Sequence, residues 1–570
     1  MKDVRPPRWA DKFLEWYCAP PFIEEIQGDL HESYHRRFVE KGKFVAALFF
    51  ILDVFKSLSV RTINWQAVYS QWSMNLIRSN IMATRRKVER RKAFFVINVV
   101  GLSTSFAAAI LIFMYVNHEL SFDNFHTKGD RIYRVYCAYA KPGESVEEFP
   151  YTPPIFAPVI NKEISGIESI ARFSKIYSAI TIKHQDKVFN ESEVYRGDSA
   201  VFNIFTFQFV KGNPKKALAE SGSAVLTRST AIKFFGSVDQ AFNQTIEVDT
   251  DQAKLYQITG IVEDIPANSH YSCNVLLSFN YDKESFNTDN WLAHDPVTYV
   301  LASESSNPAD LELSVKRLVD KILEPIHLSR FGESYEARKG KGALQEYRLQ
   351  PLNEVHLHSH HMGEAGNIIY IYLFSSVGII LIFIACFNYI NLSTARMTWE
   401  ARGASIRKVL GATRIEVRNL LLTESILVAL IASFVAIILV QIFLNVNSPI
   451  SFQFAKFSHL RIETIILPIG LAVIAGFLSG LIPSKLIDTI DSTKVLKGQF
   501  THGTKGSQLR QLFVGFQFTV SLGLIICTLL ITQQLSFLQT KSLGFDKENL
   551  LVVNNISKLG EKAATLKKIL

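Results

Sequence analysis

The chain has 570 residues, of which 48% are hydrophobic, and its 61 Lys and Arg residues outnumber its 52 Asp and Glu residues, for a formal net charge of +9. This length exceeds that of one ordinary soluble domain. The hydrophobic residues are concentrated in windows of about 20 residues almost free of charge, which excludes a purely soluble protein because such windows can cross a bilayer as helices. A basic excess is typical of proteins that bind nucleic acid or a membrane surface. The positions of the basic residues along the chain distinguish these two classes.

Residues 1–75 are predicted to form a domain of small helices. Apolar residues recur at spacings of three and four in "PPFIEEIQGDLHESY" (20–34), a pattern typical of one helical face. The stretch "KFVAALFFILDVFKSL" holds only nine apolar residues before Asp53, too few to span a membrane, and predicts a docked or interfacial helix. Residues 76–93, which contain the cationic run "RRKVERRK", are predicted to form a basic linker.

Five segments are predicted to cross the membrane as helices: 94–116, 368–392, 420–444, 464–482 and 512–535. Residues 117–367, between the first two, are rich in Asn, Asp and Gly and show strand-like alternation, so we expect an α+β domain large enough to bury its own core. Within it, "RIYRVYC" (131–137) and "IFTFQFV" (204–210) predict strands, and "TRSTAIKFFG" (227–236) predicts a capped helix that ends at glycine.

The distribution of Lys and Arg predicts the orientation in the membrane. The segment before the first span and the loops 393–419 and 483–511 are basic, whereas the loop between the third and fourth spans holds only Lys456 and Arg461. Basic loops stay on the cytoplasmic side. The fold class is therefore a polytopic α-helical membrane protein with a cytoplasmic N-terminus and a large inserted α+β extracytoplasmic domain, and no nucleic-acid partner is expected.

A faint internal echo links the first and fifth spans. Each follows a basic segment, and "ELSFD" (119–123) after the first resembles "QLSFL" (534–538) after the fifth. Residues 536–570 are therefore predicted to begin a second extracytoplasmic domain, and we expect the chain to stop inside a second half.

Three histidines, His356, His358 and His360, alternate in "EVHLHSHH" and would share one face of a strand, a geometry that can hold a metal ion. The alternative is a hydrogen-bonded strand that returns to the second span. No obvious second cluster in the sequence completes such a site, so no metal is predicted. Cys137 and Cys273 both fall in the insert, and either a disulfide or two separate thiols fits the sequence.

Polar and small residues inside the spans predict helix packing. Glu424 lies in the third span, and we expect it to pair with a nearby Arg in a structural or coupling role rather than to relay protons. Asn388 and Asn391 in the second span, and Gly476 and Gly480 in the fourth, are predicted to let helices hydrogen-bond and approach closely. The sequence has no G-x-x-x-x-G-K-[ST], G-x-S-x-G or H-E-x-x-H motif, so we predict no catalytic residue and no cofactor bound by this chain.

A compact cationic segment lies between the second and third spans. Its residues predict a short amphipathic helix that ends near Gly411, with apolar anchors and a basic rim: Arg402, Ile406, Arg407, Lys408, Val409, Leu410 and Arg414. One interpretation is a positive loop that rests on anionic lipid. The other is a docking helix for a cytoplasmic partner.

Several motifs resemble the MacB/FtsX-like permeases of bacterial ATP-binding cassette systems, and the resemblance covers about residues 80–570. They are "NVVGLSTSFAAAILIFMYVNHELSFDNFHTKGDRIYRV" (98–135), "TGIVEDIPANSH" (259–270), "ACFNYINLSTAR" (385–396), "SIRKVLGAT" (405–413), "SGLIPS" (479–484) and "KVLKGQF" (494–500). Residues 1–75, with "EEIQGDLHESY", are similar to the helical prefix of some such permeases. The family's "IHLHS" stretch matches His356 to Ser359, which weakens the metal interpretation.

The resemblance implies a mechanism. In the family an ATPase dimer binds the loop after the second span, and its nucleotide cycle reshapes the extracytoplasmic domains, a process called mechanotransmission. The implied coupling residues are those of the cationic segment, and ATP is held by the partner. The family commonly has an acidic residue at the position of Gly403, and Glu400 is expected to replace it from a neighbouring turn.

The predicted function is that of a permease subunit that drives export or extraction of a peptide, lipoprotein or drug-like cargo from the bacterial inner membrane. The expected partners are a cytoplasmic ABC ATPase dimer, a second permease copy or a related permease, a periplasmic adaptor and membrane lipid. The alternative is an FtsX-like signalling or scaffold protein that regulates a cell-envelope enzyme or senses antimicrobial peptides. A metal-dependent extracytoplasmic enzyme is the weakest hypothesis.

Overall fold

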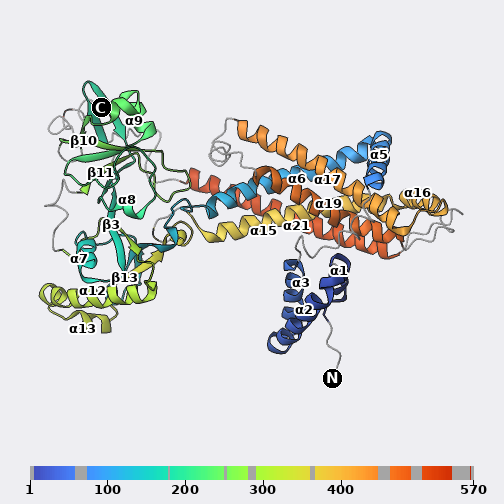
Figure 1. The fold of residues 1–570 in the computed structure, drawn as a ribbon, viewed down its shortest axis with the longest axis horizontal. Coiled ribbons are helices and arrows are strands. Elements are labelled where there is room, and N and C mark those ends of the chain that lie inside the picture. Colours follow the sequence, from blue (N-terminus) through green and yellow to red (C-terminus); the bar gives the residue numbers. More distant parts are fainter. Residues whose placement is uncertain are drawn as a thin grey trace. The chain divides into compact units, whose positions relative to one another are not determined.

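The structure is a computed structural model, which describes residues 6–18, 20–57, 74–177, 180–249, 253–279, 290–359, 362, 366–446, 463–488, 504–541 and 565. The chain divides into two units (Figure 1). The helical unit comprises Met1–Leu111, Gly378–Asn447 and Leu460–Phe537, and the domain unit is built around Ile112–Val377. Each unit is described by itself below.

Three helices near the N-terminus pack around a small apolar core. They are α1 (Arg8–Tyr17), α2 (Pro20–Lys41) and α3 (Lys43–Lys56). Leu14, Tyr34 and Phe50, one from each helix, are buried together. A hydrogen bond of 2.8 Å between His31 Nε2 and Asp11 Oδ1 links α2 to α1. The expected docked helix is therefore α3. It is too short to span a bilayer, and it buries one face against its two neighbours.

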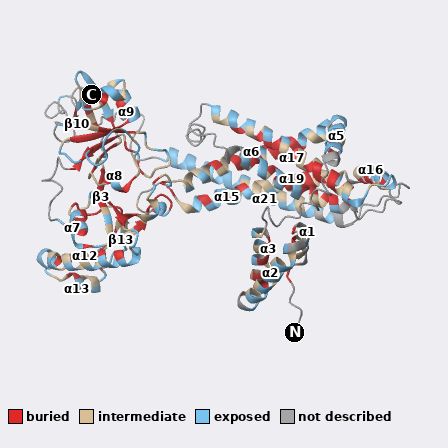
Figure 2. Cartoon of the chain, viewed as in Figure 1, coloured by how far each residue is buried: buried red, intermediate tan, exposed pale blue. Residues whose placement is uncertain are grey.

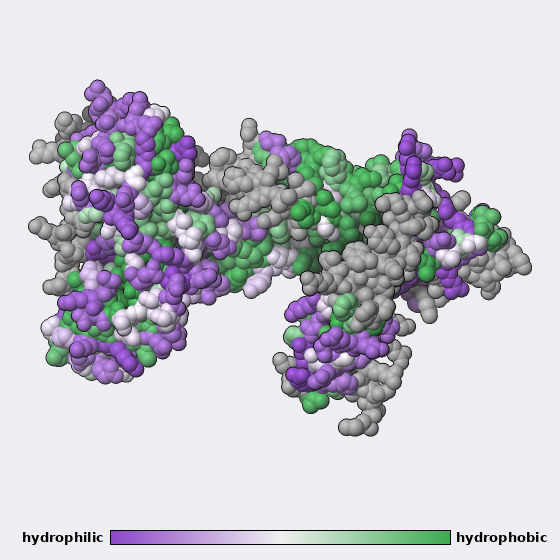
Figure 3. Space-filling model, viewed as in Figure 1, coloured by the Kyte–Doolittle hydropathy of each residue, from purple (hydrophilic) through white to green (hydrophobic). Residues whose placement is uncertain are grey.

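Five helices are long and apolar enough to cross a membrane among the residues that the structure describes. They are α6 (Lys92–Leu120), α15 (Ile368–Ala395), α17 (Arg414–Asn445), α19 (Glu463–Asp488) and α21 (Thr504–Thr540). They extend past the predicted spans because helical structure continues into the flanking polar residues. Figure 3 shows hydrophobic side chains gathered on the surface over α17 and its neighbours.

The predicted basic linker is instead a helix, α5 (Met74–Arg90), separated from α6 by Arg91 alone. The sequence "MNLIRSNIMATRRKVER" contains neither Gly nor Pro, and Asn80 and Thr84, one turn apart, are buried. Helix α5 packs on α17. The expectation of a linker was wrong because abundant charge does not prevent a helix when one face finds a partner.

The described strands of the inserted domain form one mixed sheet in the order β13-β1-β12-β3-β6-β11-β8-β10-β9-β4-β5, with β2 paired to β1 and β7 to β10. The strands are β1 (Ile132–Ala140), β2 (Glu147–Phe149), β3 (Ile167–Lys175), β4 (Ile180–His184), β5 (Lys187–Glu191), β6 (Val194–Gly197), β7 (Phe209–Gly212), β8 (Ser223–Thr227), β9 (Thr245–Asp249), β10 (Ala253–Val262), β11 (Val275–Ser278), β12 (Val297–Ala302) and β13 (Leu344–Pro351). Strand β10 runs parallel to β8, and β11 parallel to β6, whereas the other pairs are antiparallel. This mixture confirms the predicted α+β class.

Helices cover the sheet at both of its ends. The described helices of the domain are η1 (Gly129–Arg131), α7 (Phe156–Glu163), α8 (Val201–Ile204), α9 (Arg228–Phe235), α10 (Val238–Ala241), α12 (Pro308–Phe331), α13 (Tyr335–Gly340) and α14 (Leu352–Val355). Helix α12 packs on β13, and α9 packs near β8 and β10 (Figure 1). Figure 2 shows that the strands between these helices are largely buried.

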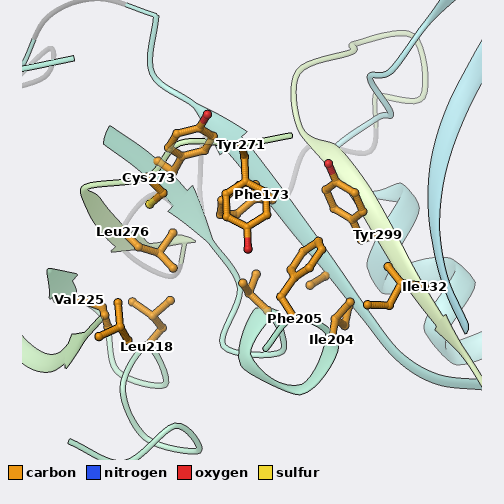
Figure 4. Packing of buried hydrophobic residues seen from close by; sticks show 14 of the residues in the cluster. Ile132, Phe173, Ile204, Phe205, Leu218, Val225, Tyr271, Cys273, Leu276 and Tyr299 are labelled. Atoms are coloured by element: carbon orange, nitrogen blue, oxygen red, sulfur yellow. The ribbon is translucent and has the colours of Figure 1, made fainter. Parts of the chain in front are cut away.

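Aromatic side chains fill the centre of the domain (Figure 4). The ring of Phe205 lies 4.9 Å from that of Tyr299 and 5.3 Å from that of Tyr271, measured between centroids. Such edge-to-face pairs stabilise a core beyond the area that they bury. The domain therefore has an apolar core of its own.

Local predictions for the domain have different outcomes. The strand predicted over 131–137 is β1, and the helix predicted over 227–236 is α9, which ends at Gly236 in the left-handed conformation with φ +87°. The strand predicted over 204–210 was wrong, because α8 ends at Ile204 and β7 begins only at Phe209. Phe205 and Phe207 instead pack into the core from the loop between these two elements.

The predicted histidine strand was also wrong. Residues 352–355 form α14, His356 and His358 lie in the turn that follows, and His360 lies outside the described residues. A turn does not place alternate side chains on one face, so the basis of the metal interpretation is lost. Among the residues that the structure describes, no group of three or more His, Cys, Asp or Glu side chains could hold a metal.

The two cysteines of the insert are separate thiols. Cys137 is buried in the cluster that includes Tyr347, and Cys273 is buried in the cluster that includes Phe173. Burial raises the pKa of the Cys137 thiol to about 12, so it stays protonated and unreactive at neutral pH. Both residues therefore act as small apolar side chains of the core.

The end of α6 is fixed to the domain by a dense set of contacts, which we call the joint. Glu119, in the last turn of α6, lies 2.8 Å from His356 Nε2, and the ring of Phe122 stacks on His356 with centroids 3.4 Å apart. The backbone N–H of Asp123 donates to the carbonyl of Asn268 at 2.8 Å. The last turns of α6 and the first turns of α15 belong to the domain unit. The joint thus makes these helix ends part of the domain.

A buried charge lies at the centre of the joint. Asp123 Oδ1 is 2.9 Å from His270 Nδ1 and 3.8 Å from His126 Nε2, and His270 Nε2 is 2.7 Å from the hydroxyl of Tyr299. Burial favours the neutral acid, but contact with His270 outweighs it and holds the pKa of Asp123 below its ordinary value. His126 Nδ1 accepts a hydrogen bond from the N–H of Thr206, so the neutral ring carries its proton on Nε2.

Acid should weaken the domain through His126. Burial lowers the pKa of His126 to about 4, whereas an unfolded histidine titrates near about 6.5. The unfolded chain therefore takes up the proton first, and we expect the domain to lose up to about 3 kcal/mol as pH falls from about 6.5 to about 4. Asp123 titrates below this window. Urea unfolding at several pH values measures the loss, and His126→Asn, which keeps an acceptor for Thr206, should flatten it. An unchanged pH dependence in the variant would contradict the assignment.

Candidate functional site: the exposed tip of helix α16

The cationic segment folds as a short helix followed by a tight turn. Helix α16 (Met397–Val409) ends before Gly411, whose φ of +99° is a left-handed conformation that favours glycine. Thr413 then caps α17: its hydroxyl accepts from the N–H of Glu416 at 3.2 Å, and the Glu416 carboxylate accepts from the N–H of Thr413 at 2.8 Å. This reciprocal capping box fixes the direction in which α17 begins.

The inner face of α16 packs against α17 and α19. Ala401, Ala404 and Ser405 are buried, and Ala404 forms a small cluster with Val417 and Ile487. The small side chains let α16 approach both helices closely. The inner face therefore fixes α16 to the helical unit.

The outer face of α16 is apolar at its centre and cationic around it. Ile406, Val409 and Leu410 are 48%, 68% and 81% exposed, and Arg402 and Arg407 are exposed beside them. Arg414 is also exposed, whereas Lys408 is half-buried. The seven predicted coupling residues thus lie close together on this helix and the turn after it. We call this set, 402 and 406–410 with 414, the α16 tip.

The chemistry of the α16 tip suits a protein partner. A single exposed leucine needs no explanation, but adjacent apolar side chains ringed by arginine are typical of the centre and rim of an interface. The tip holds no acid, because Glu400 lies on the inner side of α16 and its carboxylate is 2.7 Å from the ammonium of Lys87. The expectation that Glu400 replaces the family's acidic residue on this surface is therefore wrong.

Lys87 forms an ion cluster beneath the tip. Its Nζ lies 2.7 Å from Glu400 on α16 and 2.7 Å from Glu424 on α17, and Arg91 lies 3.8 Å from Glu400. Burial opposes the charged form of Lys87, but Glu424 and Glu400 outweigh it and raise the pKa of Lys87 above its ordinary value. One ammonium therefore joins α5, α16 and α17.

The sequence did not identify the partner of Glu424. We expected an arginine, and the structure places Lys87 there from a helix more than 300 positions earlier in the chain. The sequence does indicate that Glu424 needs a cation, because a carboxylate at the membrane boundary is costly without one, and the residues of α5 include several cations. Choosing among those cations requires the packing of α5 on α17.

Small residues allow close contact between α17 and α19. A Cβ on Gly476 would lie 2.7 Å from Ile426 Cα, and one on Gly480 would lie 2.9 Å from Ser425 Oγ. Ser425 also accepts a hydrogen bond from the Tyr389 hydroxyl at 3.0 Å. The two helices thus meet with almost no space between them at this level.

The two asparagines of α15 differ in their surroundings. A Cβ on Gly101 of α6 would lie 3.1 Å from Asn388 Nδ2, so α6 and α15 approach closely there. Asn391 Oδ1 is buried and has no hydrogen-bond partner among the described residues. Helix packing for Asn391 stays a prediction.

Replacing Gly476 by valine should separate α17 from α19. The new Cβ would meet backbone atoms, which cannot rotate away, and such overpacking costs about 1–3 kcal/mol. Thermal unfolding of the full chain in detergent measures the effect as a lower midpoint. Gly470→Val is the control, because nothing lies within 4 Å of a Cβ at that position of the same helix. Equal midpoints for the two variants would contradict close packing at Gly476.

Two protein-family models match the chain. The model described as MacB-like periplasmic core domain matches residues 95–318, and the model described as FtsX-like permease C-terminal matches residues 375–491. The first match covers most of α6 and the inserted domain as far as the middle of α12, and the second covers α16 with α15, α17 and α19. A comparison with curated proteins gives no match.

Solved structures resemble parts of the chain weakly. A domain of a permease-type protein from Porphyromonas gingivalis has 22% sequence identity and a TM-score of 0.32 over 40% of this chain and 91% of that one. The periplasmic region of MacB from Actinobacillus actinomycetemcomitans has 13% identity and a TM-score of 0.27 over the same shares. The chain therefore combines a MacB-like periplasmic core domain with an FtsX-like permease domain, the two kinds of domain that define MacB/FtsX-like permeases.

Proposed function

We propose that this chain is the permease subunit of a transporter whose ATPase is a separate cytoplasmic protein that binds the α16 tip. The observation that carries the proposal is the exposed apolar centre of the tip with its arginine rim. ATP binding and hydrolysis by the partner would move α16, and this movement would change the shape of the periplasmic core domain. The work would drive export or extraction of a peptide, lipoprotein or drug-like cargo.

The ion cluster supports the first step of this mechanism. A force on the tip reaches Glu400 through helix α16, and Lys87 ties Glu400 to Glu424 and to α5. Removing one member would leave a partly buried charge without its partner, which is costly. The base of α16 is therefore expected to move together with α5 and α17 rather than alone.

The joint supports the second step. Helix α6 is continuous from Lys92 to Leu120, and its end is held by His356 and by the contacts around Asp123. A helix with such an attachment transmits a shift or rotation to the domain that holds its end. The N-terminus and α16 are proposed to be cytoplasmic, and the domain extracytoplasmic, because the basic loops favour this orientation.

Charge reversal at the tip should release the ATPase. Affinity capture of the tagged chain from solubilised membranes is expected to recover an ATP-binding subunit. Arg407→Glu with Lys408→Glu should lower its recovery at least tenfold, because a partner surface that matches this basic rim would then face like charges, which costs several kcal/mol. Lys215→Glu with Lys216→Glu, two exposed positions of the inserted domain, is the matched control. Equal recovery with both pairs would mean that the tip does not bind the ATPase.

Weakening the joint should uncouple the domain without releasing the ATPase. Phe122→Ala with Glu119→Gln removes the stacking and the charge that hold His356. In the purified permease–ATPase complex, hydrogen–deuterium exchange of the domain should depend on nucleotide in the wild type and lose that dependence in the variant. Capture of the ATPase should stay unchanged.

Leu255→Ala, at an exposed position of β10, is the control for the joint variant. Nucleotide-dependent exchange in the domain that persists in the joint variant would contradict transmission through the joint. An FtsX-like signalling protein would use the same mechanism. A deletion strain distinguishes the two functions, because normal export of every tested cargo would favour signalling over export.

A further inference from the structure

A cleft of about 350 Å³ lies between α5, α6 and α17. Its walls are apolar, and they are formed by Val88, Phe95, Leu427, Val428 and Ile431. The volume lies at the lower end of the range of about 300–1,000 Å³ that is usual for small-molecule sites. The proposed coupling mechanism makes no use of this cleft.

The cleft lies at the boundary between the membrane core and its headgroups. Helix α5 ends at Arg90 and α6 begins at Lys92, so the cleft residues of α5 lie within two turns of the apolar span. The walls from α6 and α17 belong to helices that are long and apolar enough to cross a membrane, and Ile431 on α17 is 42% exposed. Bilayer lipid is therefore the surrounding medium of the cleft.

The mouth of the cleft is polar. The exposed residues Arg85 and Glu89 line it, and Arg85 Nε lies 3.2 Å from Glu89 Oε1. An exposed pair of this kind is worth little, so a phosphate can compete with Glu89 for the guanidinium.

The exposed face of α5 extends this positive charge. Arg78, Arg85, Arg86 and Arg90 are exposed on α5, and Glu89 is the one exposed acid among its residues with described side chains. The orientation of the helix is fixed from the opposite side, where Lys87 is held by the two carboxylates of the ion cluster. These cations therefore stay exposed, because α5 cannot turn them inward without breaking that cluster.

From this geometry we propose that the α5–α6–α17 cleft binds one anionic phospholipid, with an acyl chain along Val88, Phe95 and Ile431 and the phosphate at Arg85. The apolar walls suit the chain, and the excess of arginine favours a headgroup with net negative charge over a zwitterionic one. A bound lipid would fill the gap between α5 and α17 and brace α5, whose other face carries Lys87. The inference is independent of the ATPase partner.

Native mass spectrometry of the full chain in detergent tests the proposal, with phosphatidylglycerol and phosphatidylcholine added as probes. We expect the wild type to retain one phosphatidylglycerol in preference to phosphatidylcholine. Ile431→Trp fills the cleft and should lower retention of either lipid about tenfold. Arg85→Gln should keep the chain-binding walls but lose about tenfold of the preference for phosphatidylglycerol, the effect of one charge-assisted contact.

Two matched variants serve as controls. Ile438→Trp changes an exposed isoleucine of α17 outside the cleft, and Arg78→Gln removes an exposed arginine of α5 that does not line it. Both should bind lipid as the wild type does, and thermal unfolding checks that all four variants are folded. Equal retention in all variants would show only a non-specific lipid layer and overturn the proposal. A change from dimer to monomer in Ile431→Trp would instead assign the cleft to a contact between copies, and would also overturn it.

Discussion

A single lysine ammonium between two carboxylates organises the helical unit. Lys87 comes from α5, Glu400 from α16 and Glu424 from α17, and each carboxylate lies 2.7 Å from the nitrogen. Charges at the membrane boundary are costly unless they are paired, so each member of the cluster requires the others. This requirement fixes which face of α5 is turned inward, which side of α16 is left exposed, and where α17 meets both.

The orientation of α5 and α16 accounts for the two surfaces of this unit. With Glu400 turned inward, the outer face of α16 is left with apolar and basic residues, which is the composition expected of a docking surface. With Lys87 turned inward, the remaining cations of α5 face outward beside an apolar cleft. One set of ion pairs therefore separates a surface proposed for a protein partner from a site proposed for a lipid.

The inserted domain uses the same physical device at its own attachment. Asp123 is buried with His270 and His126, and Glu119 contacts His356, so the end of α6 is held by polar contacts and a stacked ring rather than by a flexible tether. The proposed mechanism depends on this attachment, because a movement of α6 reaches the domain only through its fixed end. Rigid attachment is what such mechanics needs.

The sequence by itself determined the features that depend on local composition. Long apolar windows specify spanning helices because the backbone must satisfy its hydrogen bonds within lipid, and the period of Ile406, Val409 and Leu410 specifies the apolar stripe of α16. Motifs of several residues identified the family before any contact was known. The end of α9 at Gly236 was likewise predictable from the sequence, because glycine adopts the left-handed conformation at little cost.

Only the tertiary structure decided which distant residues meet. Alternation in "EVHLHSHH" predicted a strand, but the contact of His356 with Glu119 and Phe122 holds these residues in a turn. Basic residues of 76–93 were read as a linker, and packing on α17 makes most of them a helix. Periodicity reports which side of an element is apolar, whereas the partner of a charge depends on three-dimensional proximity, which no local pattern contains. The pairing of Lys87 with Glu424 and the cleft beside it belong to that second class.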